Sequence, residues 1–196
     1  MAITKETELK TMLPAAVASK MLAAYPWQAA FTQTNSYYDT PTAALKSANS
    51  ALRIRSFADY AEQTLKVRAT GVEERRITEY TDRLTLPQAA ELITQQRILT
   101  GATVTSELTK LQVHPDALHI FASLKTIRRQ CPLAAGLLVL DHSFFSDGTD
   151  DWELEIEYTD HAAAAAAFTQ ISTRFAFTIS GSVSKIARAS AHTPGR

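Results

Sequence analysis

The sequence predicts an α+β fold in which about eight antiparallel strands form a closed β-barrel, a charged tunnel with helices packed outside. Three strand-like segments predict it, because charged and uncharged residues alternate along each of them. Residues 51–55 and 64–68 carry arginine or lysine at alternate positions, and residues 152–158 carry three glutamates in one phase. Successive side chains of a strand point to opposite faces, so each segment has one charged and one uncharged face.

The sorting of these charges by sign favours a barrel over an ordinary exposed sheet. A solvated sheet face usually mixes Thr, Ser, Gln and Lys with its charged residues. A solvated outer face stays the alternative for any single strand, but a barrel explains all of them, with charge in the lumen and apolar residues against helices. Because a charged lumen is costly unless its groups pair or bind ions, basic strands suit a polyanion and acidic strands suit divalent cations.

Strands and helices alternate along the first half of the chain without a linker or repeat. Pro14 suits the first turn of a helix, Asn49–Ser50 and Asp59–Tyr60 are turn sequences, and Gly71 reverses the chain between two strands. The elements expected here are a strand at 3–12, a helix at 14–25, a strand at 31–38, a helix at 41–48, a strand containing Arg53 and Arg55, and strands at 63–69 and 72–82.

The second half opens with a helical region and then returns to strands. Leu86–Pro87 begins helices that continue to about Phe121, with breaks near Gly101 and at His114–Pro115. The Ala-rich stretch after His161 favours a helix. The remaining elements expected are strands at 124–130, 136–145 and 152–158, a turn at 147–150, helices at 161–172 and 182–191, and a loose tail.

The composition fits one soluble domain in a reducing compartment. Of 196 residues, 45% are hydrophobic, enough to bury a core without disulfides. Twenty basic and twenty acidic residues cancel, so no global field attracts nucleic acid or an anionic membrane. Cys131 is the lone cysteine and is interpreted as a packed thiol. Without a hydrophobic signal region or an apolar run of bilayer length, a cytoplasmic protein is expected.

Short charged motifs follow one another in a characteristic order. Glu6-x-Glu8-x-Lys10 opens the chain, and R-x-R, K-x-R and E-x-E motifs begin at Arg53, Lys66 and Glu155. In this order they resemble the CYTH domains, the triphosphate tunnel metalloenzymes. The matching segments are Tyr37–Pro41, Leu52–Arg55, Leu65–Arg68, Ile77–Tyr80, Thr126–Arg128, Leu140–Asp141, Glu155–Glu157 and Ser184–Ala189. The resemblance implies a single tunnel domain over residues 1–190 and a loose tail over 191–196.

The basic residues suit a triphosphate. Guanidinium groups donate parallel hydrogen bonds to forked phosphate oxygens, and lysines add compact charges. Both can neutralise charge that builds up during phosphoryl transfer. The phosphate-binding residues expected with the family resemblance are Lys10, Arg53, Arg55, Lys66, Arg68, Arg128 and Lys185, of which Lys10, Lys66 and Lys185 are expected to act in catalysis.

The acidic residues suit Mg²⁺ or Mn²⁺, which prefer hard oxygen ligands. The metal ligands expected are Glu6, Glu8, Asp141, Glu155 and Glu157, with Glu79 and Glu153 as secondary candidates. Glu153 is expected at the mouth of the tunnel. By resemblance, one cation bridges phosphate oxygens, and a second positions and acidifies the attacking water.

Several of these residues have a plain structural alternative. Arg68 could be an ordinary surface residue, Asp141 a turn former near a strand end, and Lys185 a solvated helical lysine that does not reach the lumen. Of Arg128 and Arg129 only one can point inward, and the family's register favours Arg128.

Other motifs in the sequence give weaker evidence of a functional site. The five histidines show no ligand spacing for zinc. The acidic segment 147–151 is more typical of a hairpin turn than of a calcium loop. Tyr37 and Tyr38, with Trp27 and Phe31, could stack on a base, but core or rim packing is the interpretation preferred.

The function predicted is metal-dependent hydrolysis of inorganic triphosphate or a related organic triphosphate. A class IV adenylate cyclase is the first alternative, although no residue can be assigned to adenine recognition. A polyphosphate- or nucleotide-binding module without turnover is the second. The partner expected is a small triphosphate, with no nucleic acid and no membrane, and a homodimer is left open.

Overall fold

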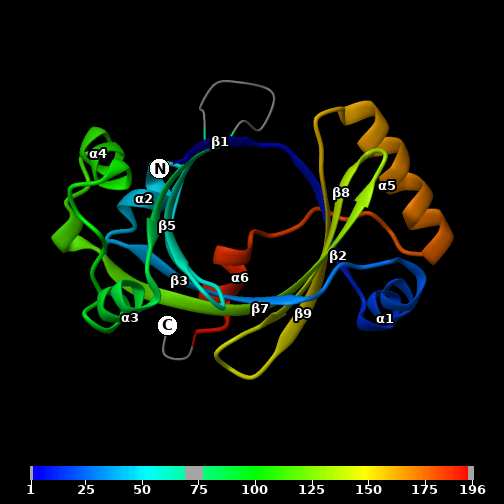
Figure 1. Ribbon diagram of the computed structural model, residues 1–196, viewed down its shortest axis with the longest axis horizontal. Coiled ribbons are helices and arrows are strands. Elements are labelled where there is room, and N and C mark those ends of the chain that lie inside the picture. Colours follow the sequence, from blue (N-terminus) through cyan, green and yellow to red (C-terminus); the bar gives the residue numbers. More distant parts are fainter. Residues whose placement is uncertain (1, 69–76, 194–196) are drawn as a thin grey trace.

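The computed structural model describes the backbone of residues 2–68 and 77–193, and the side chains of residues 7–68 and 77–193. This part of the chain forms a strongly curved sheet with helices around it (Figure 1). The strands are β1 (Ala2–Glu6), β2 (Glu8–Leu13), β3 (Phe31–Asp39), β4 (Ser50–Ser56), β5 (Ala61–Arg68), β6 (Ile77–Leu84), β7 (His119–Leu133), β8 (Gly136–Phe144) and β9 (Asp150–Glu157). The helices are α1 (Ala15–Ala24), α2 (Ala44–Ser47), α3 (Leu86–Thr94), α4 (Thr103–Lys110), α5 (His161–Phe175) and α6 (Lys185–Ala191), with a 3-10 turn, η1 (Pro115–Ala117).

The sheet is antiparallel throughout, in the order β1-β6-β5-β4-β3-β7-β8-β9-β2. Consecutive strands are mostly neighbours, as tight hairpins require. The strands form a strongly curved ribbon, and α6 lies inside the lower part of this curve in the view of Figure 1.

The predicted closed barrel of eight strands is corrected in two respects. The sheet has nine strands in the described chain, and no ladder there joins its edge strands β1 and β2. The reason is that the strand expected at 3–12 divides at Thr7, and its halves pair with different neighbours, β6 and β9. Thr7 O accepts a hydrogen bond from Tyr158 N at 3.1 Å. The covalent chain therefore connects the two edges, where a barrel would have a ladder.

The alternation of charged and apolar faces is confirmed in the strands. On β4, Leu52 and Ile54 are fully buried in a core under α2, α3 and α4, while Arg53 and Arg55 lie on the opposite, concave face. On β9, Leu154 and Ile156 pack in the same way under α1 and α5. Truncating one such buried side chain to alanine would cost about 2–5 kcal/mol. The apolar faces thus hold the curved sheet against its outer helices and leave the charged faces inside.

The helix α6 packs at a third, smaller core. Ala189 and Ile186 contact a cluster that contains Tyr37, Ala122 and Leu124 of β3 and β7. Ser184 caps the first turn by accepting a hydrogen bond from Ala187 N at 3.4 Å. This packing places one face of α6 toward the concave side of the sheet.

Most predicted elements are found with small changes of boundary. The helical region expected up to Phe121 was wrong at its end, because β7 begins at His119 and runs for fifteen residues. Residues 119–124 pair with β3, and this long-range pairing decides their conformation. The first part of the strand expected at 72–82 lies outside the described residues.

Three local predictions can be compared with the structure. Cys131 is a buried thiol, and burial raises its pKa. Residues 145–149 form the β8–β9 hairpin, with Phe145 N donating to Thr149 O at 2.9 Å. The tail differs from the prediction as far as it is described, since Ala191 ends α6 and His192 Nδ1 lies 2.7 Å from Asp147 Oδ2. None of the helices in the described chain has the length and apolar character needed to span a membrane.

Candidate active site

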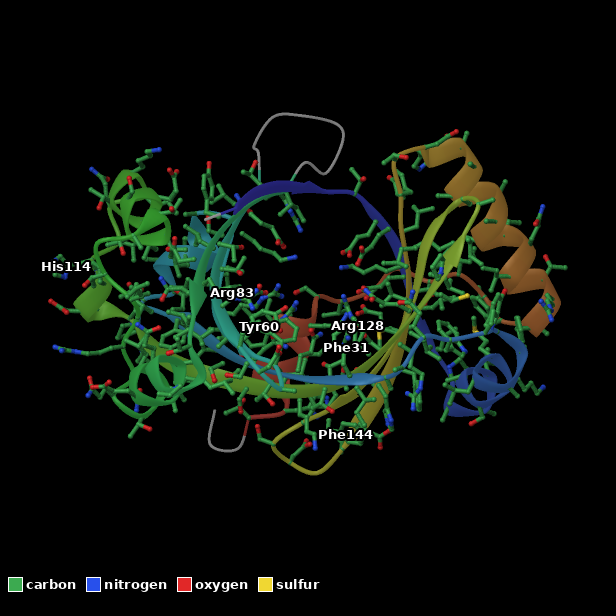
Figure 2. The ribbon with its side chains drawn as sticks, viewed as in Figure 1. Phe31, Tyr60, Arg83, His114, Arg128 and Phe144 are labelled. Atoms are coloured by element: carbon green, nitrogen blue, oxygen red, sulfur yellow. The ribbon has the colours of Figure 1, made fainter. Side chains whose placement is uncertain are left out.

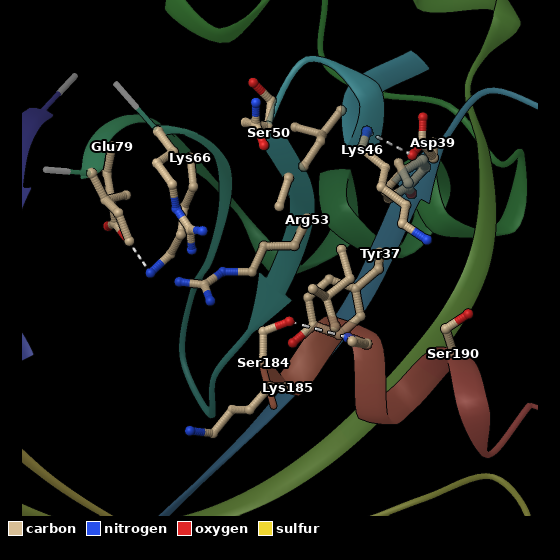
Figure 3. A pocket seen from close by; sticks show the side chains of 18 of the residues that line it. Tyr37, Asp39, Lys46, Ser50, Arg53, Lys66, Glu79, Ser184, Lys185 and Ser190 are labelled. Atoms are coloured by element: carbon tan, nitrogen blue, oxygen red, sulfur yellow. Dashed lines mark hydrogen bonds and ion pairs between the residues drawn. The ribbon is translucent and has the colours of Figure 1, made fainter. Parts of the chain in front are cut away.

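A cavity of about 590 Å³ lies on the concave side of the sheet. Figure 2 shows Arg128 within the curve of the strands, and Figure 3 shows Arg53, Lys66 and Lys185 projecting from β4, β5 and α6. The lining contains these residues from the predicted set: Glu8, Lys10, Arg53, Arg55, Lys66, Arg68, Glu79, Arg128, Glu155, Glu157 and Lys185. Side chains that are far apart in the sequence therefore meet at one internal surface.

The β4 side of the cavity is a basic wall in which Arg53 and Arg55 are both half-buried. Arg55 Nε donates to Asn35 Oδ1 at 2.8 Å. Among the described residues, the carboxylate oxygen recorded nearest to the Arg55 guanidinium is Glu62 Oε1, which lies 4.0 Å from Nη1. Burial, with the nearby charges of Arg53 and Arg128, lowers the pKa of Arg55 to about 9. Arg53 Nε is buried and has no hydrogen-bond partner among the described residues. A bound anion would compensate both guanidinium groups.

Two ion pairs lie beside this wall. Lys66 Nζ is 2.5 Å from Glu79 Oε1, on the neighbouring strand β6. Lys10 pairs with Glu8 two residues earlier on β2. Both pairs are partly exposed to the cavity, so these lysines can exchange a carboxylate for a ligand oxygen at modest cost.

The opposite wall is acidic and is tied together by Arg128. Its guanidinium forms a fork with Asp141, with Nε to Oδ1 at 2.8 Å and Nη2 to Oδ2 at 2.7 Å. The same Nη2 donates to Glu155 Oε2 at 3.1 Å, and Nη1 lies 3.7 Å from Glu157 Oε1. Arg128 therefore points inward, as predicted, and orients three carboxylates of β8 and β9.

Lys185 enters the same cluster from α6. Its Nζ lies 2.9 Å from Asp141 Oδ2 and 2.7 Å from Glu155 Oε1, and it also contacts Glu153. Burial lowers the pKa of Lys185, but the three carboxylates more than offset this and raise it. Burial likewise raises the pKa of Glu155, while Lys185 and Arg128 outweigh it and hold that pKa well below its ordinary value. Lys185 and Glu155 are thus both charged at neutral pH.

The acidic wall contains carboxylates that are close enough together to hold Mg²⁺ or Mn²⁺. Asp141, Glu153 and Glu155 each offer an oxygen, and these three oxygens lie within 4.8 Å of one another. Hard carboxylate oxygens suit these cations, so the donor set fits in its chemistry. The three negative charges of the set are already balanced by Lys185, Arg128 and Arg188. A divalent cation would therefore have to replace the ammonium group.

Three of the predicted site residues are not among the residues that line the cavity. Glu153 was expected at the tunnel mouth, and this was wrong, because it is fully buried behind the cavity wall. Asp141 is not a turn former; it lies within β8, buried, and supports Arg128 and Lys185. The side chain of Glu6 lies outside the described residues. Arg68 is exposed but lines the cavity.

Sequence reasoning missed the residues behind the acidic wall. Arg188 is buried and contacts Glu153 and Asp151, and Ser182 Oγ donates to Glu153 Oε1 at 2.5 Å. One signal was available: Arg188 follows Lys185 by three residues, which places both on one face of a helix.

The match to known families agrees with this arrangement. Residues 4–190 match the family model described as "CYTH domain". The chain belongs to the CYTH domain family. Among curated proteins, this CYTH domain is 32% identical over 161 residues to "Putative triphosphatase YjbK" of Bacillus subtilis (strain 168), covering 80% of this chain and 77% of that protein.

Solved structures show the same fold. A Bacillus halodurans protein described as "a putative adenylate cyclase" has a TM-score of 0.85 at 26% identity, covering 96% of this chain and 98% of its own. An adenylyl cyclase candidate from Hippeastrum, HpAC1, has a TM-score of 0.79 at 20% identity, covering 95% of each chain. That second protein is described as having a dominant triphosphatase activity. Its likeness to this chain concerns the fold.

Proposed function

We propose that this CYTH domain is a divalent-metal-dependent triphosphatase that hydrolyses inorganic triphosphate or a related organic triphosphate. The observation that carries the proposal is the pair of half-buried arginines on β4. The buried Nε of Arg53 has no hydrogen-bond partner among the described residues, and Glu62 Oε1, the nearest carboxylate oxygen recorded for Arg55, is 4.0 Å away. Eight basic and six acidic side chains line the cavity in the described chain. The excess positive charge favours a polyanion, and the volume of about 590 Å³ falls in the range of small-molecule sites.

The basic residues of the cavity would bind the triphosphate and stabilise its transition state. Arg53 and Arg55 would donate charge-assisted hydrogen bonds to oxygens of the triphosphate chain, each contributing about 1.5–3 kcal/mol. Lys66 and Lys10 would bind other oxygens of the same triphosphate. Lys185 would reach the phosphoryl group nearest the acidic wall. These cations stabilise the negative charge that spreads over the oxygens in the transition state.

The reaction transfers one phosphoryl group to water. The water oxygen forms a bond to the terminal phosphorus and its proton is released to solvent. The anhydride P–O bond breaks, and its electron pair leaves with diphosphate or, for an organic triphosphate, with the organic diphosphate. A Mg²⁺ or Mn²⁺ ion, when bound, would supply Lewis-acid stabilisation of phosphate oxygens and a more acidic water. Asp141, Glu155 and Glu157, with Glu8 and Glu6, are the residues proposed to hold it. Glu153 and Glu79 would act as supports.

Three substrates test the proposal. Purified protein is incubated with inorganic triphosphate, thiamine triphosphate or ATP, each with Mg²⁺ or Mn²⁺ and with EDTA as the control. Metal-dependent release of phosphate supports the triphosphatase. Formation of cyclic AMP from ATP would replace it with an adenylate cyclase, and tight binding without product would replace it with a binding module.

A further inference from the structure

A second layer of charge lies behind the acidic wall of the cavity. Its members are Glu153 and Asp151 of β9 and Arg188 of α6, and none of the three lines the cavity. Glu153 is fully buried and Arg188 is 8% exposed. The proposed chemistry does not use Arg188, so its burial needs another explanation.

Glu153 joins this second layer to the cavity wall. Its Oε1 accepts a hydrogen bond from Arg188 Nη1 at 3.0 Å, and its Oε2 contacts Lys185 Nζ. Arg188 Nε also lies 2.8 Å from Asp151 Oδ2. One carboxylate is therefore shared between a lysine that faces the cavity and an arginine that does not.

The arrangement is costly for stability. Buried ion pairs often contribute less than well-packed apolar residues of the same volume. In addition, Arg188 Nη2 is buried and has no hydrogen-bond partner among the described residues. Because burying Arg188 in this way contributes little to stability, we interpret it as a residue that positions its neighbours.

The electrostatic consequence concerns Lys185. Arg188 neutralises one oxygen of Glu153, so Lys185 is not drawn fully to that residue and stays in contact with Asp141 and Glu155. Because Lys185 and Arg188 are three residues apart on α6, the arginine also fixes the rotation of the helix that carries the lysine.

We propose that Arg188 is a positioning residue: acting through Glu153, it holds the Lys185 ammonium at the cavity wall, where it can reach a phosphate. As a statement about catalysis this rests on the proposed function. Removing an outer partner of this kind typically costs about tenfold to a hundredfold in affinity or activity at metal sites. A similar loss is expected here.

A double-mutant cycle tests the proposal. Arg188→Gln removes the charge, Glu153→Gln removes the carboxylate that would then over-attract Lys185, and the double variant removes both. We expect Arg188→Gln to raise the KM for inorganic triphosphate and its Kd by calorimetry about tenfold or more. We expect Glu153→Gln to restore most of this loss in the Arg188→Gln background. Independent, additive losses, or wild-type binding by Arg188→Gln, would overturn the proposal.

Arg188→Lys is the variant to use if Arg188→Gln does not fold. It keeps a positive charge near Glu153 and loses the second contact with Asp151, so we expect a Kd between those of wild type and Arg188→Gln. A defect in Arg188→Lys as large as that of an Arg188→Met variant of equal thermal stability would contradict a role through charge.

The reactivity of Lys185 separates this inference from the proposed function. Reductive methylation with ¹³C-formaldehyde, followed by NMR, reports how accessible the ammonium is. We expect Arg188→Gln to lower the Lys185 reaction rate and the double variant to restore it, whether or not triphosphate is a substrate. A rate unchanged by Arg188→Gln would overturn the positioning role, while failure of wild type to bind triphosphate would overturn only the proposed function.

Discussion

Lys185 Nζ lies 2.9 Å from Asp141 Oδ2 and is buried among carboxylates that also have the spacing to hold a cation. A single ammonium from α6 thus stands where oxygen ligands from β8 and β9 converge. Two cations cannot share this position, because their repulsion in a buried site would be large. Metal binding and the inward position of Lys185 should therefore compete.

This competition predicts the behaviour of Lys185→Met. Without the ammonium, Asp141, Glu153 and Glu155 keep an unbalanced negative charge, so the affinity for Mn²⁺ without substrate should rise about tenfold, or 1.4 kcal/mol. The affinity for triphosphate should fall at the same time. Calorimetric titration of both ligands checks this, with Lys20→Met, at an exposed position of α1, as the control. Unchanged Mn²⁺ affinity would exclude competition.

Arg55→Met should weaken triphosphate binding. The substitution keeps much of the side-chain volume but removes charge-assisted hydrogen bonds of about 1.5–3 kcal/mol, so the KM should rise about tenfold to a hundredfold. The metal concentration needed for half-maximal rate should change much less. Arg97→Met, an exposed arginine outside the cavity, is the matched control. An unchanged KM would place Arg55 outside the substrate site.

Glu8→Gln should abolish metal-dependent turnover without unfolding the protein. Glu8 lines the cavity and is partly exposed there, so its replacement opens no apolar void. Circular dichroism and thermal unfolding should stay close to wild type while phosphate release is lost. Glu91→Gln on the exposed surface of α3 controls for a change of one charge. Full activity of Glu8→Gln would refute its assignment to the metal.

The sequence predicted the faces of the strands better than their connections. Arg53 and Arg55 were correctly placed opposite Leu52 and Ile54, because a period of two needs no tertiary information. The break at Thr7 was missed, since it reflects which neighbours each half-strand meets and not a local signal.

The sequence pattern also could not predict which glutamates of β9 reach the cavity and which are buried behind its wall. Glu153 and Glu155 share one phase on β9, yet only Glu155 lines the cavity, because α6 covers Glu153 with Lys185 and Arg188. Such a contact joins residues about thirty positions apart and has no spacing to reveal it. The Mg²⁺ or Mn²⁺ cofactor, the homodimer and the cytoplasmic location stay predictions.

The charges of the acidic wall predict a loss of stability in acid. The pKa of Glu155 is held below its ordinary value in the folded state by Lys185 and Arg128, against the effect of burial. Its stabilising contribution is therefore present above the unfolded pKa of about 4.3 and is lost as pH falls toward the folded pKa.

Urea unfolding between pH 3 and 7 measures this contribution. Wild type should lose unfolding free energy as the pH falls below about 4.3, and Glu155→Gln should show a shallower loss. Asp116→Asn, whose side chain is 72% exposed, should follow wild type. Equal pH dependence in wild type and Glu155→Gln would contradict the ion-pair assignment.

Gly136→Ala should disturb both the fold and the cavity. Gly136 begins β8 with a φ of +138°, and a Cβ built there would lie 2.2 Å from the backbone oxygen of Glu157. Gly101→Ala is a matched control, because Gly101 also has a positive φ, +73°, but open space around it. A Cβ at positive φ costs about 1–2 kcal/mol. Gly136→Ala adds a clash with the backbone of Glu157, so it should lose clearly more unfolding free energy than Gly101→Ala. Since Glu157 lines the cavity, it should also raise the KM for triphosphate. Equal losses of unfolding free energy in the two variants would mean that the backbone of β9 can move away from the new Cβ without destabilising the protein.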